Sequence, residues 1–189
     1  MNLLPSRFKQ GLRCIMLTWR GKDGGNATRP DRIAIKRITT NEEEFDKAFD
    51  ELAVLKSQSK NPLRIYSSVN SRDIKKAQRE FKQRQLDADY FDEDSRNQFY
   101  LDIKNRWISC LMKQNCREET LFLIDIDEEV TDQDCKVLAR EHLKNLGVEI
   151  VYEYPTKNGT HIITKPFNPN LFNTNFGEVK KDALLLIDY

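Results

Sequence analysis

The chain has 189 residues, of which 39% are hydrophobic and 32% charged, and its formal net charge is +1. This balance is typical of one globular unit with a polar surface and excludes a largely disordered or membrane-embedded chain. The near-zero net charge excludes a global basic field for nucleic acid, but it is compatible with a local basic groove.

The front half begins with an apolar run at residues 14–19, followed by a loop at residues 20–31 that is marked by glycines and a proline. Residues 32–38 alternate apolar and charged side chains, as a half-buried strand does. A helix is predicted from Asn41, which can cap it, with Glu44 three residues later. Apolar side chains recur on one face of this helix at Phe45, Phe49, Leu52 and Leu55.

Residues 62–69 are expected to form another strand, and residues 70–86 a helix opened by Asn70 or Ser71. The stretch 86–97 is rich in aspartate and is expected to be an acidic loop. A further helix, roughly residues 98–112, carries Phe99, Ile103, Trp107 and Leu111 at helical spacing.

The back half predicts a more regular alternation of strands and helices. Residues 119–127 form a strand, and residues 131–147 a helix with a capping box from Thr131 to Asp134 and a terminating glycine. A hairpin follows, with strands at 148–156 and 160–167 around an Asn-Gly turn. Residues 168–179 hold a short helical turn, and residues 183–189 close the chain as a strand. This order is that of a split βαβ sheet, ferredoxin-like or RRM-like.

Two carboxylates end the apolar strand at residues 121–127. Residues two apart in a strand share a face, so Asp125 and Asp127 project together. Two carboxylates this close repel each other unless a cation lies between them. Hard oxygen ligands favour magnesium or manganese, so the pair predicts a divalent metal site.

A third acid, Asp188, ends the apolar run at residues 184–187 in the same way. We expect the strand that carries it to lie beside the strand from Leu121, which would bring three carboxylates together as in a two-metal site. His161 and Lys165 alternate on the hairpin strand, and Lys157 lies in its turn. These three basic groups are candidates for binding a triphosphate.

The order of these motifs resembles the archaeo-eukaryotic primase superfamily, whose RRM-like catalytic core carries three of them. A hydrophobic strand ending in Asp-x-Asp is matched by Asp125 and Asp127, and small-x-His by Gly159, Thr160 and His161 in "NGTH". A hydrophobic run ending in an acid is matched by "LLLID" at Asp188. Two features depart from the pattern: Asp188 is the penultimate residue, and the zinc module of some primases has no counterpart.

The resemblance implies an α+β fold in which residues 1–118 form an N-terminal αβ module and residues 119–189 the RRM-like catalytic module. It implies two Mg²⁺ or Mn²⁺ ions held by the three aspartates, with His161 at the phosphates of a ribo- or deoxyribonucleotide. The reaction would be template-directed nucleotidyl transfer to a 3′-hydroxyl by a primase-polymerase. The expected partners are a template and primer and a helicase or other replication or repair protein, as in a phage or mobile element.

The cysteines at positions 14, 110, 116 and 135 lack zinc-site spacing, and the chain has only two histidines, so no zinc is expected. Reduced thiols favour a cytoplasmic protein, nucleoid-associated or in a host cytoplasm if phage-encoded. No segment approaches about 20 apolar residues, so no membrane span is expected.

Two other functions compete with nucleotidyl transfer. The first is a primase-like scaffold that binds nucleic acid or a partner without catalysis. The second is a haloacid-dehalogenase-type phosphatase, whose Asp-x-Asp supplies a nucleophile, but too few residues follow Asp127 for its later motifs. Arg72, in a basic helical stretch, is a further candidate for a phosphate groove, although charges on a helix are usually only solvated.

Overall fold

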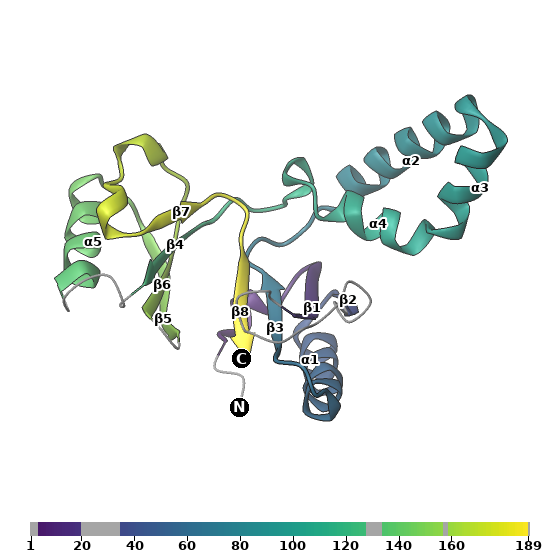
Figure 1. Ribbon diagram of the computed structural model, residues 1–189. Helices are drawn as coiled ribbons and strands as arrows, with labels where there is room; N and C mark the ends of the chain where they lie inside the picture. Colours follow the sequence, from purple (N-terminus) through teal and green to yellow (C-terminus); the bar gives the residue numbers. More distant parts are fainter. Residues whose placement is uncertain (1–3, 20–34, 128–133, 157–158, 189) are drawn as a thin grey trace.

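The computed structural model describes residues 4–19, 35–127, 134–156 and 159–188. Within them the chain is a mixed α+β structure with two antiparallel four-stranded sheets and five α-helices. Figure 1 shows the two sheets side by side, with a group of helices extending away from them as an arm. None of the helices in these ranges is long and apolar enough to cross a membrane.

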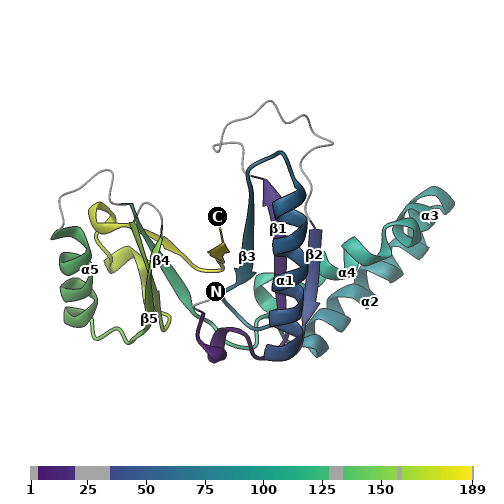
Figure 2. The same ribbon diagram turned by 90° about the horizontal axis from the view of Figure 1, so that it is seen from below.

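The first sheet has the order β2-β1-β3-β8. Its strands are β1 (Arg13–Trp19), β2 (Ile35–Thr39), β3 (Leu63–Ser68) and β8 (Leu184–Asp188). Helix α1 (Glu42–Gln58) lies along this sheet (Figure 2). Three of its strands come from the front of the chain, and the last one from its end, so the two ends of the chain complete one sheet.

The predicted start of helix α1 is confirmed. Asn41 accepts a hydrogen bond from the Glu44 amide at 2.9 Å, and the Glu44 carboxylate accepts one from the Thr40 amide at 2.8 Å. These two bonds satisfy amides that the first helical turn leaves without partners. Phe45 and Leu52 on the predicted apolar face are fully buried against the sheet.

The helical arm differs from the prediction. It consists of α2 (Ile74–Phe91), α3 (Glu93–Leu101) and α4 (Ile103–Leu111). Asp73 caps α2, since its side chain accepts from the amides of Lys75 and Lys76, while Asn70 binds the backbone of Leu121. The prediction of an acidic loop at residues 86–97 is wrong, because α2 continues to Phe91 and Asp92 then caps α3. Acids that looked like a loop instead stabilise a helix N-terminus, where the helix dipole favours negative charge.

The second sheet has the order β5-β6-β4-β7. Its strands are β4 (Phe122–Asp127), β5 (Ile150–Thr156), β6 (Gly159–Thr164) and β7 (Glu178–Lys180). Helix α5 (Asp134–Asn145) ends before Gly147, whose φ of 68° permits the predicted stop. The predicted Thr131 cap lies outside the described residues. Short 3₁₀ turns occur at Ser6–Phe8, Gln114–Cys116, Pro169–Leu171 and Thr174–Phe176.

One predicted strand pairing is wrong. The strand ending at Asp188 does not lie beside the strand from Leu121; the neighbour of β4 on that side is the short strand β7, with Leu123 opposite Lys180. The last strand instead pairs with β3, where Leu185 lies opposite Ser67. Leu185 is fully buried there in the core that the sheets share, and this burial decides the pairing.

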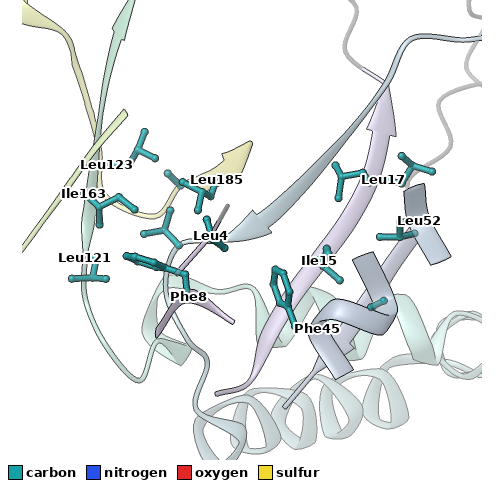
Figure 3. Close-up of a cluster of buried hydrophobic side chains, with 14 of the residues drawn as sticks. Leu4, Phe8, Ile15, Leu17, Phe45, Leu52, Leu121, Leu123, Ile163 and Leu185 are labelled. Carbon is teal, nitrogen blue, oxygen red and sulfur yellow. The ribbon is translucent and has the colours of Figure 1, made fainter. Parts of the chain in front are cut away.

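That shared core joins the two sheets. Leu121, Leu123 and Ile163 from the second sheet lie in one buried cluster with Phe8 and Leu185 (Figure 3). Side chains of α1 and β1, including Phe45, Ile15 and Leu17, extend the same cluster. A second cluster, with Ile124, Ile162 and Leu143, lies between the second sheet and α5. The second sheet is therefore buried on both faces over much of its area.

Candidate functional site

Four polar side chains form a row across the second sheet. Tyr154 of β5 lies opposite His161 of β6, His161 opposite Asp125 of β4, and Asp125 opposite Glu178 of β7. Alternation along the strands places this row on the face of Leu123 and Ile163, which is the face turned toward the first sheet. The opposite face carries apolar side chains that pack on α5. We call these four residues and Lys180 the polar row.

Asp125 is the most strongly perturbed acid of the row. Its Oδ1 accepts a hydrogen bond from His161 Nε2 at 2.9 Å, and its Oδ2 accepts one from Lys180 Nζ at 2.5 Å. The bond from His161 lowers the pKa of Asp125 most; partial burial opposes this, and Lys180 adds to it, leaving the pKa far below its ordinary value. The carboxylate is therefore ionised throughout the physiological range.

The ionised state of Asp125 determines where protons lie on His161. A carboxylate only accepts hydrogen bonds, so Nε2 of His161 must carry a proton. The other ring nitrogen, Nδ1, contacts the hydroxyl of Tyr154, and that hydroxyl also reaches the Leu186 carbonyl at 3.3 Å. The direction of the bond between Nδ1 and Tyr154 depends on the tautomer of His161: where Nδ1 donates, Tyr154 can donate to Leu186, and where Nδ1 accepts, Tyr154 gives it its one proton.

Tyr154 links the row to the first sheet, because Leu186 belongs to β8. Burial raises the pKa of the Tyr154 hydroxyl most, and the negative charge of Asp125 raises it further. The phenol therefore stays neutral and acts as a hydrogen-bonding bridge. The contact holds the histidine ring from the side opposite to Asp125.

Lys180 joins two carboxylates at the other end of the row. Its ammonium group lies 2.5 Å from Asp125 Oδ2 and 3.2 Å from Glu178 Oε2. Burial lowers the pKa of Lys180, but its bonds to Asp125 and Glu178 outweigh this and raise it. The positive ammonium group of Lys180 thus lies between two negative carboxylates, so this point of the sheet stabilises a cation.

Close approach of backbones explains the glycine of the small-x-His motif. A Cβ built on Gly159 would lie 1.9 Å from the carbonyl oxygen of Ile126 on β4. Gly177 is similar, since its Cβ would lie 2.8 Å from the Asp125 carbonyl oxygen. Glycine at these two positions lets β6 and the segment before β7 approach β4 on both sides of Asp125.

The structure brings together only some of the predicted site residues. Asp127 lies at the exposed end of β4, on the face of Asp125 and opposite Gly159. Thr160 is buried and occupies the opposite face of β6, with Ile162. Lys165 lies beyond the end of β6 and binds Glu119 at 3.1 Å. Lys157 lies outside the described residues.

Two predicted residues lie in other environments. Asp188 is in the first sheet, where its Oδ2 accepts a bond from Lys56 at 2.7 Å. Arg72 is buried and binds Asp182 at 3.0 Å, so it does not line an open groove. Its side chain connects the segment before α2 to the segment before β8.

The carboxylates of the polar row offer oxygen ligands to a metal ion. Among the described residues, no three histidine, cysteine, aspartate or glutamate side chains lie close enough together to hold an ion. Asp125 and Glu178 nevertheless share one cation, the ammonium group of Lys180. The oxygens of Asp125 and Glu178 have the chemistry that magnesium and manganese prefer, whereas Asp127 lies on the same face of β4 without forming a three-residue group with them. Asp188 is not part of this set in the described arrangement.

Three members of the row were missed in the sequence. Glu178 and Lys180 lie in a three-residue strand, which is too short for a periodic signal, and only its pairing with β4 places them beside Asp125. Tyr154 belongs to a predicted strand, where its alternation with Tyr152 was the available signal.

Comparisons with known proteins do not assign the chain to a family. No protein-family model matches the chain, and neither a curated protein nor a solved structure matches it.

Proposed function

We propose that the polar row is the nucleotide-binding centre of a metal-dependent nucleotidyltransferase of the primase-polymerase kind. The observation that carries the proposal is the contact between Asp125 and His161, at 2.9 Å across neighbouring antiparallel strands. Residues of the Asp-x-Asp and small-x-His motifs, 36 positions apart in the chain, thereby meet in one site. Their order alone does not require that contact.

The strand order of the second sheet supports the same proposal. In a split βαβ sheet the first and third strands lie in the middle, flanked by the fourth and the second. Counted from β4, the order β5-β6-β4-β7 follows this scheme, with β7 as the fourth strand. The fold proposed is therefore RRM-like in its second sheet, with short 3₁₀ turns where a second helix would lie.

Asp125 and Glu178, which already share the ammonium group of Lys180, would hold the divalent ions, Mg²⁺ or Mn²⁺, with Glu178 in the role that the motif order assigns to Asp188. Asp127, at the exposed end of β4, would have to turn toward them to complete the set. Such ions, when bound, stabilise negative charge on the transferred phosphoryl group. Lys180 would have to leave Asp125 for a metal to bind there. Its ammonium group and the His161 imidazole then become available to donate to triphosphate oxygens.

The chain's own groups orient this binding. Tyr154 and the Leu186 carbonyl hold the His161 ring from Nδ1, so that Nε2 stays directed at the position of Asp125. Asp125 remains ionised and ready to accept a cation, because its pKa lies far below the working range. The template and primer, and a helicase or repair partner in a cytoplasmic setting, belong to the same proposal.

One observation favours the alternative of an inactive scaffold. Both oxygens of Asp125 are already engaged by His161 and Lys180, as in a purely structural ion-pair network. The same engagement disfavours a phosphatase, because a nucleophilic carboxylate needs an oxygen free to attack phosphorus.

Primer extension separates these functions. Purified protein, a primed template, Mn²⁺ or Mg²⁺ and either kind of nucleotide should give extended primer, and Asp125→Asn should reduce the rate by at least about 100-fold. Glu178→Gln should reduce it similarly. Asp188→Asn is the matched control and should retain most of the activity, because Asp188 lies in the other sheet with Lys56.

The outcomes distinguish the assignments. If Asp188→Asn abolishes primer extension and Glu178→Gln does not, the metal ligand is Asp188 and not Glu178. No extension by the intact protein on DNA or RNA templates, together with no Mn²⁺ binding by calorimetry, would reject the proposal in favour of the scaffold.

A further inference from the structure

The helical arm ends in an exposed apolar surface. Tyr90 is 86% exposed, Leu101 83%, Phe91 73% and Leu86 64%. Leu86, Tyr90 and Phe91 belong to the last turns of α2, and Leu101 ends α3. Figure 1 shows the junction of α2 and α3 at the outer end of the arm. Large side chains this exposed, and this close in the chain, mark an interaction surface. We call residues 86–103 the tip of the arm.

Charge is segregated along the same arm. The tip carries the acidic side chains Asp87, Asp89, Asp92, Glu93, Asp94 and Asp102, with Arg96 as its one base. The inner half of α2, residues 74–84, which we call the root, carries the exposed basic side chains Lys75, Lys76, Arg79 and Lys82. An arm that is acidic and apolar at one end and basic at the other is complementary to an inverted copy of itself.

The basic and apolar side chains lie on one side of α2. Lys75, Arg79, Lys82 and Leu86 follow each other at spacings of four, three and four, which keeps them on one helical face. The opposite face carries Ala77, which is buried, and Phe81, which contacts Phe99 and Trp107 of the returning helices. The charged stripe therefore faces away from the packed side of the arm.

We propose that the arms of two copies of this chain pack antiparallel, with the acidic, apolar tip of each against the basic root of the other. Twofold symmetry makes both contacts identical, and their spacing matches automatically because one arm supplies both ends. Tip-to-tip packing would instead place two acidic clusters together, which like charge disfavours.

The size of the arm sets the expected strength. An 18-residue helix is about 27 Å long, and two packed helices are about 20 Å wide, so one face covers roughly 500 Å². Stable interfaces use about 800 Å² from each partner. The pairing should therefore be weak, and it should weaken further with salt.

Sedimentation velocity on the full chain tests this pairing. Between 5 and about 300 µM in 50 mM NaCl, the average mass should rise from 22.2 kDa for one chain toward about 44 kDa, and 500 mM NaCl should reduce the association at least about threefold. A mass that stays at one chain at 300 µM in low salt would overturn the proposal and leave the tip to a different partner.

Charge reversal provides the specific test. The double variant Asp87→Lys, Asp89→Lys should remain monomeric, because it makes the tip basic. The double variant Lys75→Glu, Arg79→Glu should also remain monomeric, because it makes the root acidic. A mixture of the two double variants should associate again, because each supplies the charge that the other lost. Asp50→Lys with Glu141→Lys, on exposed positions of α1 and α5, is the matched control and should associate as the native chain does. Failure of the mixture to associate, with both variants shown to be folded by circular dichroism, would contradict the antiparallel arrangement.

Discussion

The buried ion pair between Arg72 and Asp182 gives the sharpest test of the structure. The side chains are 1% and 8% exposed, and two guanidinium nitrogens lie 3.0 and 3.2 Å from the two carboxylate oxygens. Asn70 also donates to Asp182 at 3.2 Å and binds the backbone of Leu121. Hydrogen bonds among Asn70, Arg72 and Asp182 therefore connect the segments before α2 and β8 to the start of the second sheet.

Arg72→Met keeps much of the side-chain volume but leaves Asp182 buried without its cation. Breaking a buried pair on one side costs about 3–5 kcal/mol in the free energy of unfolding. For a chain of this length each kcal/mol lowers the melting temperature by about 2–4 °C, so a loss of roughly 6–20 °C is expected. The double variant Arg72→Met, Asp182→Leu should recover most of it, because no unpaired charge remains.

Urea unfolding of the native chain, both single variants and the double variant gives the coupling energy directly. A coupling energy below about 1 kcal/mol, or a single variant as stable as the native chain, would refute the view of Arg72 as a buried structural residue. Loss of nucleotide binding at unchanged stability would instead restore its predicted place in a phosphate groove.

Three further outcomes are expected. The pKa of Asp125 is lowered in the folded chain. Its contribution to the free energy of unfolding should therefore be complete above about pH 4, the pKa of an unfolded aspartate, and should decline as the pH falls below that value. In urea unfolding, the free energies at pH 3 and pH 6 should differ less for Asp125→Asn than for the native chain. Gly159→Ala should lower stability by about 1–3 kcal/mol in thermal melts, because its Cβ would meet Ile126. Burial raises the pKa of Cys14 to about 11, so at pH 8 a thiol reagent should modify the partly exposed Cys135 while Cys14 stays protected.

Local patterns in the sequence predicted several elements correctly. The cap at Asn41 and the apolar face with Phe45 and Leu52 defined α1, and these signals act within one helix. The alternation in β4 also placed Leu123 and Asp125 on one face and Ile124 on the other. Such features follow from the geometry of a single strand or helix, so they need no knowledge of distant partners.

The errors arose where partners are distant in the chain. The acidic stretch after Leu86 looked like a loop because its acids were counted as polar, whereas Asp92 is a helix cap. Arg72 was predicted to lie on a charged helix, but it precedes α2 and is buried, and the acid that pairs with it, Asp182, lies 110 residues later in the chain.

Strand and turn patterns in the sequence are enough to show that acids end an apolar strand at Asp125 and that a histidine follows a glycine on the next hairpin strand. The residues that lie beside them depend on how the strands pair in three dimensions. Asp188 is in the first sheet because burial of Leu185 in the shared core draws the last strand to β3. Glu178 and Lys180 take the place beside Asp125, since strand pairing depends on which faces are buried and on backbone approach, and not on order along the chain.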